Sequence, residues 1–318
     1  MRIYLDCIPC FLRQSIEAAR HVTPDPCVHE QVVREVLGLM NNLDTRQTPP
    51  KIAQDIHQLI RNLTGVADPY LAVKQQFNAI AMQLYPELHK TILDSADTLD
   101  TAVRLAIAGN IIDFGVLGKL GEDDLHRTIR DCLTADISDI QLEPFRGAVR
   151  NAEKILYLAD NAGEIVFDRL LIEQLPMEKI TVAVKGLPII NDATMEDAVY
   201  AGLTDEVEVI DNGADIPGTV LESCSASFRR RFEQADLIIA KGQGNYETLS
   251  DVDKNIFFIL KAKCQVVARH LGCEVGKMIF QQSKNHLRRK RECRDMINCI
   301  SGPRFKGYSA SIYMLRTQ

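Results

Sequence analysis

The stretch Ile155-Leu-Tyr-Leu-Ala-Asp-Asn-Ala-Gly-Glu164 decides the fold class. Its four leading apolar residues predict a strand covered on both faces, and the polar turn that follows leads into a helical pattern from Glu164 to Gln174. Four more short apolar runs come later, and helical patterns separate most of them; the runs are residues 180–184, 207–210, 237–239 and 265–267. Alternating strands and helices are typical of parallel strands joined by right-handed crossovers. We therefore expect an α/β fold, with a Rossmann-like αβα domain and a mainly parallel sheet over residues 149–283.

The sequence before this domain has a different periodicity. Apolar residues recur at helical spacing from Pro9 to about Gly118, and turn signals such as Pro49-Pro50 and Asp68-Pro69 separate the runs. This predicts an N-terminal helical lobe over residues 1–148, and 318 residues are enough for two domains. After the α/β domain, residues 284–318 form a basic C-terminal segment that either is a solvated helix face or contacts a polyanion or a partner.

Composition narrows the function classes. Hydrophobic residues make up 46% of the chain and charged residues 25%, which is ordinary for a globular protein. No run of eighteen apolar residues predicts a membrane span, and Asp6 interrupts the place where a signal peptide needs an apolar run. Nine scattered cysteines fit a reducing compartment, so we expect a cytoplasmic protein. The net charge of −6 argues against a dedicated nucleic-acid binder, and the oligomeric state stays open.

Acidic and amide side chains follow the first two predicted strands. Asp160 and Asn161 come directly after the first strand, and Asp192 closes the loop after the second. In a parallel sheet, ligands bind beyond the carboxyl ends of the strands, so these side chains should converge there. Carboxylate and amide oxygens suit hard divalent cations. The same residues could instead be ordinary helix caps and turns.

Groups suited to an anion lie at the same edge of the predicted sheet. Gly163 precedes a helix whose N–H groups could hold a phosphate, and Lys241 adds a cation at the end of the fourth strand. Gly242 lets the backbone approach an anion closely, and Asn245 belongs to the same strand end. Metal, cation and N–H donors together predict a phosphoryl site. The Gly242-Gln-Gly-Asn-Tyr-Glu247 run is an incomplete dinucleotide fingerprint, which is the weaker interpretation.

Two further motifs need an interpretation. In the helical lobe, Asn110 and Asp113 lie three residues apart, so they share one helix face that is either exposed or turned toward the cleft between the lobes. Cys7-Ile-Pro-Cys10 is a CxxC pair at a predicted helix start. It supplies only two of the four ligands that a structural zinc site needs. Buried thiols, a metal or iron–sulfur site and a redox pair all remain open for Cys7 and Cys10.

The ordered set of motifs resembles the DUF89 family of damage-control phosphatases. The motifs are Asp6-Cys-Ile-Pro-Cys-Phe-Leu-Arg-Gln14, Gly109-Asn-Ile-Ile-Asp-Phe114, Asp160-Asn-Ala-Gly-Glu164, Pro188-Ile-Ile-Asn-Asp192 and Lys241-Gly-Gln-Gly-Asn-Tyr-Glu247. The CxxC is similar to that of the prokaryotic subfamily I. The resemblance covers about Asp6 to Gly276 and leaves the basic tail unexplained.

The resemblance implies a metal-dependent phosphatase that acts on small phosphometabolites, such as sugar phosphates or damaged nucleotides, with Mn²⁺, Ni²⁺, Co²⁺ or Mg²⁺ as the cofactor. The family's metal ligands fall here on Asp160, Asn161 and Asp192, and the family's lysine falls on Lys241, which we expect at the phosphate. Glu164 or Asp113 would orient the attacking water. The rival classes are an S-adenosylmethionine-dependent methyltransferase and a non-enzymatic CxxC metal or redox module. Phosphate release from a panel of phosphoesters, with and without Mn²⁺, separates the three.

Overall fold

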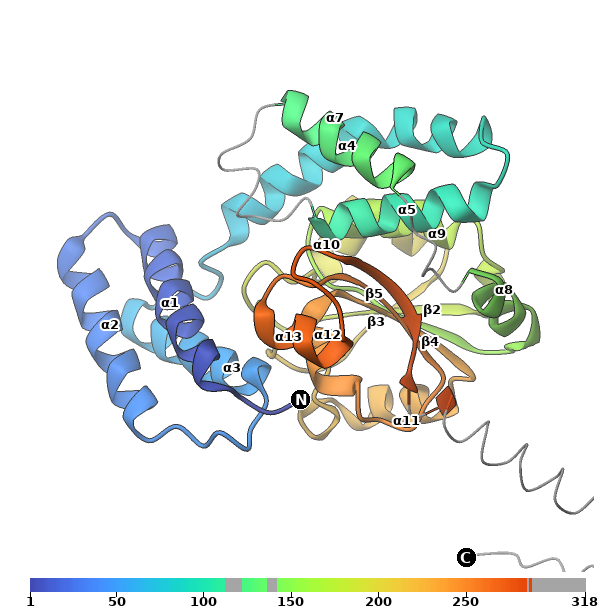
Figure 1. Cartoon of the computed structure of the whole chain (residues 1–318). Helices are drawn as coiled ribbons and strands as arrows, with labels where there is room; N and C mark the ends of the chain where they lie inside the picture. The colour runs from blue at the N-terminus through green and yellow to red at the C-terminus, as the bar shows by residue number, and fades with distance from the viewer. Residues whose placement is uncertain (112–121, 136–141, 285, 288–318) are drawn as a thin grey trace, which may run out of the picture.

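A computed structural model of the chain describes residues 1–111, 122–135, 142–284 and 286–287 (Figure 1). Its helices before the sheet are α1 (Ile8–Val22), α2 (Pro26–Asn41), α3 (Pro49–Thr64), α4 (Leu71–Leu93), α5 (Thr98–Ile111), α7 (Glu122–Thr134) and α8 (Leu142–Asn151). The later helices are α9 (Glu164–Ile172), α10 (Met195–Tyr200), α11 (Ala226–Gln234), α12 (Gly242–Leu249) and α13 (Gln265–Leu271). Short 3₁₀ turns lie at Leu5–Cys7, Met177–Lys179, Leu203–Asp205 and Leu221–Ser223. In the described part of the chain, no helix is long and apolar enough to cross a membrane.

The sheet confirms the predicted α/β class. Its strands are β1 (Ile155–Leu158), β2 (Ile180–Val184), β3 (Glu208–Asp211), β4 (Leu237–Lys241), β5 (Ile256–Lys261) and β6 (Met278–Gln282). They are ordered β3-β2-β1-β4-β5-β6. All neighbouring pairs are parallel except β5 and β6, which are antiparallel. The chain therefore reverses its direction of winding between β1 and β4, and a ligand crevice is expected at that point of the sheet.

One predicted strand is wrong, and two strands were missed. Residues 265–267 form the start of α13, with Cys264 as the N-cap. A three-residue apolar run cannot distinguish a buried strand from a buried helix, which explains the error. The fifth strand is instead the longer apolar run Ile256–Lys261, and β6 pairs with it at the sheet edge. Between β3 and β4, helix α11 begins after its N-cap Ser225.

Two hydrophobic cores cover the two faces of the sheet, and Figure 1 shows helices on both faces. Successive residues of β1 alternate between them: Ile155 and Tyr157 pack into the core on one face, and Leu156 and Leu158 into the core on the other. The first core includes side chains from α4, α5, α7, α8, α9 and α10. The second includes side chains from α11, α12 and α13. A buried parallel sheet needs apolar residues on both faces, which is why β1 reads as a continuous apolar run.

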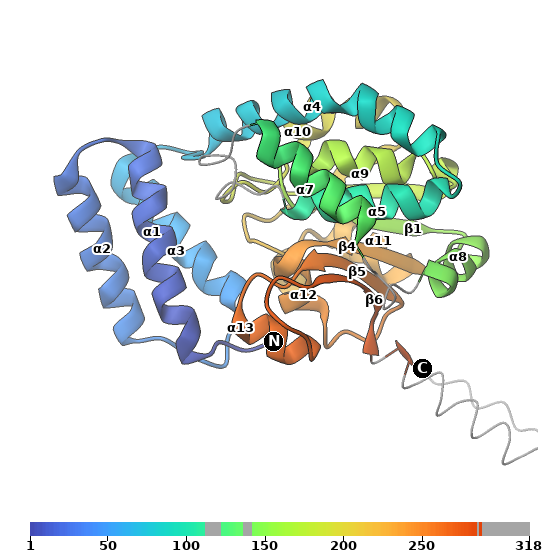
Figure 2. The same cartoon turned by 45° about the horizontal axis from the view of Figure 1, so that its top comes forward.

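Helices α1, α2 and α3 form a third core of their own, built on residues such as Phe11, Val36 and Ile56. In Figures 1 and 2 these three helices stand together beside the sheet, and α4 and α5 lie over it. We call residues 1–64 the cap. The predicted helical lobe over residues 1–148 therefore comprises two parts, because the apolar faces of α4, α5, α7 and α8 are buried against the sheet. Periodicity reveals that a helix is amphipathic but not which partner covers its apolar face.

A polar cluster ties the cap to the α/β domain. Arg61 of α3 forms an ion pair with Asp215 at 2.5 Å and donates to the carbonyl of Pro188 at 3.0 Å. The amides of Gln54 and Gln58 donate to the same Asp215 carboxylate, at 2.5 and 3.1 Å. Burial alone would raise the pKa of Asp215, but these three donors outweigh it and lower that pKa. Asp215 thus joins one face of α3 to the loop after β3.

Candidate active site

The ends of β1 and β2 bring three predicted metal ligands together. Asp160 and Asn161 follow β1, and Asp192 lies in the loop after β2. The N–H of Ala193 donates to the carbonyl of Asp160 at 2.8 Å, and Asn161 and Asp192 form an isolated β-bridge. Asp160 and Asp192 are both buried. Residues separated by 32 positions in sequence therefore meet at one sheet edge, as the strand-end rule requires.

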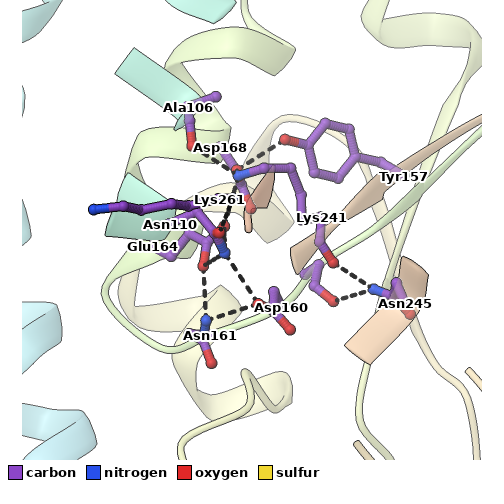
Figure 3. A network of polar contacts seen from close by, with 11 residues as sticks. Ala106, Asn110, Tyr157, Asp160, Asn161, Glu164, Asp168, Lys241, Asn245 and Lys261 are labelled. Carbon is purple, nitrogen blue, oxygen red and sulfur yellow. Dashed lines mark hydrogen bonds and ion pairs between the residues drawn. The ribbon is translucent and has the colours of Figure 1, made fainter. Parts of the chain in front are cut away.

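Hydrogen bonds orient the amide of Asn161. Its Nδ2 donates to Asp160 Oδ2 and to Glu164 Oε2, both at 2.8 Å. The amide oxygen takes no part in these two hydrogen bonds. Figure 3 shows this arrangement around Asn161. An amide oxygen is a ligand that a hard cation accepts beside carboxylates.

Asn110 of α5 reaches the same group of carboxylates. Its Nδ2 donates to Asp160 Oδ2 at 3.1 Å and to both oxygens of Glu164 at 3.0–3.1 Å. Its Oδ1 accepts the backbone N–H of Lys261, at the end of β5, at 3.1 Å (Figure 3). These hydrogen-bond partners are all protein atoms, so Asn110, predicted to bind phosphate, here links α5, β1 and β5. Asp113, the other residue of that predicted helix face, lies outside the described residues.

Like charges gather in this site. The pKa of Asp160 is raised well above its usual value, first by burial and then by the nearby Glu164 and Asp192 carboxylates. The pKa of Asp192 is raised to about 6 by burial, although Lys185, 3.3 Å away, opposes the shift. A bound cation would offset both the burial and the repulsion.

The donor set therefore fits a divalent cation, with two carboxylates and one amide oxygen. In the described residues, no three His, Cys, Asp or Glu side chains converge as a metal set, so the amide of Asn161 is essential to this fit. Water and substrate oxygens would complete the coordination of a hard cation held by so few protein ligands.

Gly242 makes room for Asp160. Its φ is +80°, and an added Cβ would stand 1.7 Å from Asp160 Oδ2 and 2.0 Å from Asp160 Cγ. Only glycine satisfies both the backbone conformation and this close approach. The predicted role of Gly242, close approach to an anion, is met here by a carboxylate of the protein itself.

Lys241 differs most from its expectation. Its side chain has no exposed area, and its Nζ donates to Asp168 Oδ1 at 2.5 Å, to Glu164 Oε1 at 2.7 Å and to the carbonyl of Ala106 at 3.0 Å. An ammonium group has three donors, so none is left for a phosphate. Burial alone would lower the pKa of Lys241, but Asp168 and Glu164 outweigh it and raise that pKa. The structure therefore places Lys241 below the site, as the counter-ion of two carboxylates.

Glu164 and Asp168 complete this buried network (Figure 3). Glu164 accepts hydrogen bonds from Asn110, Asn161 and Lys241. Both its oxygens are engaged, so in this arrangement Glu164 holds Asn161 and does not face a water. Asp168 accepts from Tyr157 Oη at 2.8 Å, and burial raises its pKa to about 6 although Lys241 opposes that shift. The sequence analysis did not predict Asp168 as a site residue, because Asp168 lies inside helix α9 and not at the end of a strand.

Two other predicted phosphate contacts also have protein partners. The N–H of Gly163, whose φ is +74°, donates to Asn78 Oδ1 at 2.6 Å. Asn245 is buried; its amide donates to the carbonyl of Lys241 at 2.8 Å and accepts from Thr219 Oγ1 at 2.7 Å. Both residues thus shape the strand ends. Their sequence signals, a glycine and an amide beside a strand, are the same for a structural and a ligand-binding role.

A cavity of about 590 Å³ opens above the carboxylates, between the cap and the α/β domain. Asp160, Asn161 and Asp192 line it on one side, and Cys7 and Cys10 of the cap line it on another. The polar lining outside the quoted motifs comes from Lys263, Cys264, Gln265 and Arg269. Lys263 lowers the pKa of Asp160, so its charge acts on the site. Lys263 and Cys264 follow β5, the strand that the sequence analysis missed.

The chain is similar to known proteins over most of its length. The family model of the damage-control phosphatase ARMT1-like domain matches residues 3–279. A damage-control phosphatase of Archaeoglobus fulgidus is 38% identical over 290 residues, covering 88% of this chain and 98% of that protein. One from Pyrococcus horikoshii is 36% identical over 293 residues, covering 89% and 99%. The crystal structure of a DUF89 family protein from Pyrococcus horikoshii matches with a TM-score of 0.83 at 32% identity, covering 89% of this chain and 100% of that one.

Proposed function

This chain belongs to the ARMT1-like, or DUF89, family of damage-control phosphatases, and from that premise we propose that it is a metal-dependent phosphatase acting on small phosphorylated metabolites. Its named relatives are damage-control phosphatases, so the reaction class follows the family. The metal and the substrate class, sugar phosphates or damaged nucleotides, are our proposals. The family favours this function over a methyltransferase or a non-enzymatic CxxC module.

The observation that carries the proposal is the buried carboxylate group at the end of β1. Asp160 and Asp192, with the amide oxygen of Asn161, would hold a divalent cation such as Mn²⁺, Ni²⁺, Co²⁺ or Mg²⁺. The raised pKa of Asp160 and the room that Gly242 leaves for its carboxylate support this assignment. When bound, such a cation supplies Lewis acidity to the phosphate and lowers the pKa of a water.

The side chains around the cation have separable tasks. Glu164, held by Lys241, fixes the amide of Asn161. Lys263, on the opposite wall, offers positive charge to the phosphate oxygens. The first turn of α12 begins at Gly242, and its N–H groups have no partners within the helix, so they suit an anion. The cap excludes bulk water from the cavity and limits the size of the leaving group.

A phosphate-release assay tests the function. Purified protein, stripped with a chelator, is given a panel of sugar phosphates and nucleotides with and without Mn²⁺. We expect turnover only with the cation, and Asp192→Asn should require more Mn²⁺ for half-maximal rate. Glu178→Gln, at an exposed residue far from the cavity, is the matched control. Equal turnover with and without the cation, or equal Mn²⁺ dependence of Asp192→Asn and the parent protein, would contradict the metal assignment.

A further inference from the structure

Three cysteine side chains line the cavity of the candidate active site. Cys7 immediately precedes helix α1, and Cys10 lies in the first turn of that helix. Cys264 immediately precedes helix α13. All three line the cavity that contains Asp160. All three are free thiols. Each of Cys7 and Cys264 has its pKa raised, first by burial and to a lesser extent by other cysteines. The metal-dependent reaction uses none of them.

Cys7 and Cys10 differ in environment although they are only three residues apart. Cys10 is the third residue of α1 and is exposed, whereas Cys7 precedes the helix and is half-buried. Cys10 is the more accessible of the two thiols, so we assign it as the one that attacks a disulfide in the cavity. The sheltered thiol is positioned to resolve the product.

Cys264 has a different setting. Its Sγ accepts the N–H of Val267 at 3.5 Å and lies 3.8 Å from the amide of Gln243. A sulfur that caps a helix in this way acts as an acceptor, so we assign it to the wall and not to the reacting pair. In the described residues, the thiols and acids do not converge as a metal set, which favours redox chemistry over a shared ion.

We propose that Cys7 and Cys10 form a reversible dithiol–disulfide site in the wall of the catalytic cavity, and that its substrate is a small disulfide. The cavity volume of about 590 Å³ suits a small molecule. Lys263 and Arg269 line the same cavity, where Arg269 forms an ion pair with Asp6 at 3.6 Å.

The reaction balances as two exchanges. The Cys10 thiol gives its proton to water, and its thiolate attacks one sulfur of R–S–S–R; the S–S bond breaks, and one RS⁻ leaves with the electron pair and takes a proton from water. Cys7 then gives its proton to the Glu247 carboxylate, which lines the same cavity. The Cys7 thiolate attacks Cys10 Sγ, the Cys7–Cys10 bond forms, the bond from Cys10 to the remaining RS group breaks, and the second RS⁻ leaves and takes up a proton. Two protein thiols are oxidised and one disulfide is reduced to two thiols.

The test uses the full-length, reduced protein with glutathione disulfide as the probe. We expect the intact mass to fall by two hydrogens, peptide mapping to show a Cys7–Cys10 link, and an excess of dithiothreitol to reverse the change. Cys7→Ser should retain one glutathione on Cys10, and Cys10→Ser should lose the fast reaction. Cys264→Ser should still form the link. If a serine variant is unstable, the test is repeated with Cys7→Ala and Cys10→Ala.

Cys27 provides the matched control. It is exposed and lies in the first turn of α2, so it shares the helix position of Cys10 but does not line the cavity. Cys10 should react on the order of tenfold faster than Cys27, and Cys27→Ser should behave as the parent protein. Equal rates for Cys10 and Cys27, a link to any other cysteine, or retention of a stoichiometric Zn²⁺ that Cys7→Ser and Cys10→Ser abolish would overturn the proposal.

A second readout rests on the proposed phosphatase function. The disulfide changes the cavity wall and leaves Asp160 and Asp192 untouched, so oxidation should raise KM for the phosphoester without changing the Mn²⁺ requirement. An unchanged KM in the oxidised protein would show that the site is separate from the substrate path and overturn its placement there. If the reduced protein releases no phosphate from any substrate, the proposed function fails, and the thiol mapping still decides the present proposal.

Discussion

At the scale of single residues, Lys241 compensates the charge of buried carboxylates of the protein and not that of a substrate. Lys241 has the position expected of a phosphate ligand at the end of a strand, yet its three donors serve Glu164, Asp168 and Ala106. A buried carboxylate without a partner is costly, so Lys241 stabilises the Glu164 side chain that holds Asn161. Its contribution to the reaction is thus indirect.

Replacing Lys241 by methionine should therefore destabilise the fold. Lys241→Met leaves two buried carboxylates without their cation and should lower the free energy of unfolding by about 3–5 kcal/mol, measured by urea denaturation. Lys241→Met/Asp168→Asn should recover part of this loss, because one of the two charges is gone. Lys154→Met, at an exposed lysine, should be close to neutral. Normal stability of Lys241→Met with kcat reduced on the order of 10²–10³-fold would instead place Lys241 at the phosphate.

Glu247 predicts a pH dependence of stability. Burial raises its pKa to about 7, against the opposing Gln243 hydrogen bond. From about pH 4.5, its usual pKa, to about pH 7, the folded state keeps a proton that the unfolded state has lost, so stability falls as pH rises through this window. Glu247→Gln removes this dependence and should be more stable than the parent by about 2 kcal/mol above pH 7 and nearly equal to it below pH 4.5. Melting curves across this range check it, with Glu178→Gln as the exposed control; a constant difference between Glu247→Gln and the parent at all pH values would disprove it.

At the scale of elements, the sequence specified β1, β2 and β4 because each is an unbroken apolar run followed by polar turn residues. The predicted metal ligands follow two of these strands: Asp160 and Asn161 follow β1, and Asp192 lies in the loop after β2. The sequence alone therefore predicts that the three residues lie at one edge of the sheet. The cavity wall after β5 could not be predicted, since β5 itself was not recognised. The burial of Lys241 and the partners of Gly163 and Asn245 depend on α4, α5 and α9, whose packing the motifs do not encode.

The turn between β4 and α12 offers a test with a matched control in the same chain. Gly242 and Gly272 both have φ near +80°, namely +80° and +78°. An added Cβ at Gly242 would collide with the Asp160 carboxylate, whereas at Gly272 it would meet nothing within 4 Å. Both alanine variants should lose about 1–2 kcal/mol of stability from the left-handed backbone.

Only Gly242→Ala should affect the metal. We expect its Mn²⁺ affinity to fall on the order of 10–100-fold, because the Asp160 carboxylate must move. Isothermal titration calorimetry with Mn²⁺ on both variants separates the effects. Equal affinities in Gly242→Ala and Gly272→Ala would show that the position of Asp160 is not needed for metal binding.

At the scale of the whole molecule, the active-site cavity lies between two bodies with separate cores. The cap has its own core, and Asp215 receives donors from Gln54, Gln58 and Arg61 across the junction. Apolar periodicity predicted the helices of both parts but could not show that α4 onward joins the sheet. The junction depends on the contacts between α3 and Asp215, which apolar periodicity does not predict.

Breaking this junction should loosen the cap. Asp215→Ala leaves three polar side chains of α3 without their acceptor and should speed hydrogen exchange in α1–α3, equivalent to about 1–3 kcal/mol of local stability. KM should rise while kcat changes little. Glu30→Gln breaks the exposed Arg34–Glu30 pair within α2 and serves as the control. Exchange in α1–α3 that is equally fast in both variants would show that Asp215 does not hold the cap in place.

The separate core of the cap has a consequence for how such enzymes diversify. Because Phe11, Val36 and Ile56 pack with one another and not with the sheet, mutations can reshape the cap without disturbing the carboxylates of the site. Selection can then change which leaving groups enter the cavity while the chemistry at Asp160 and Asp192 stays constant. Lineages of this family should therefore differ more in α2 and α3 than around the end of β1, so that new substrates are acquired through changes in the cap.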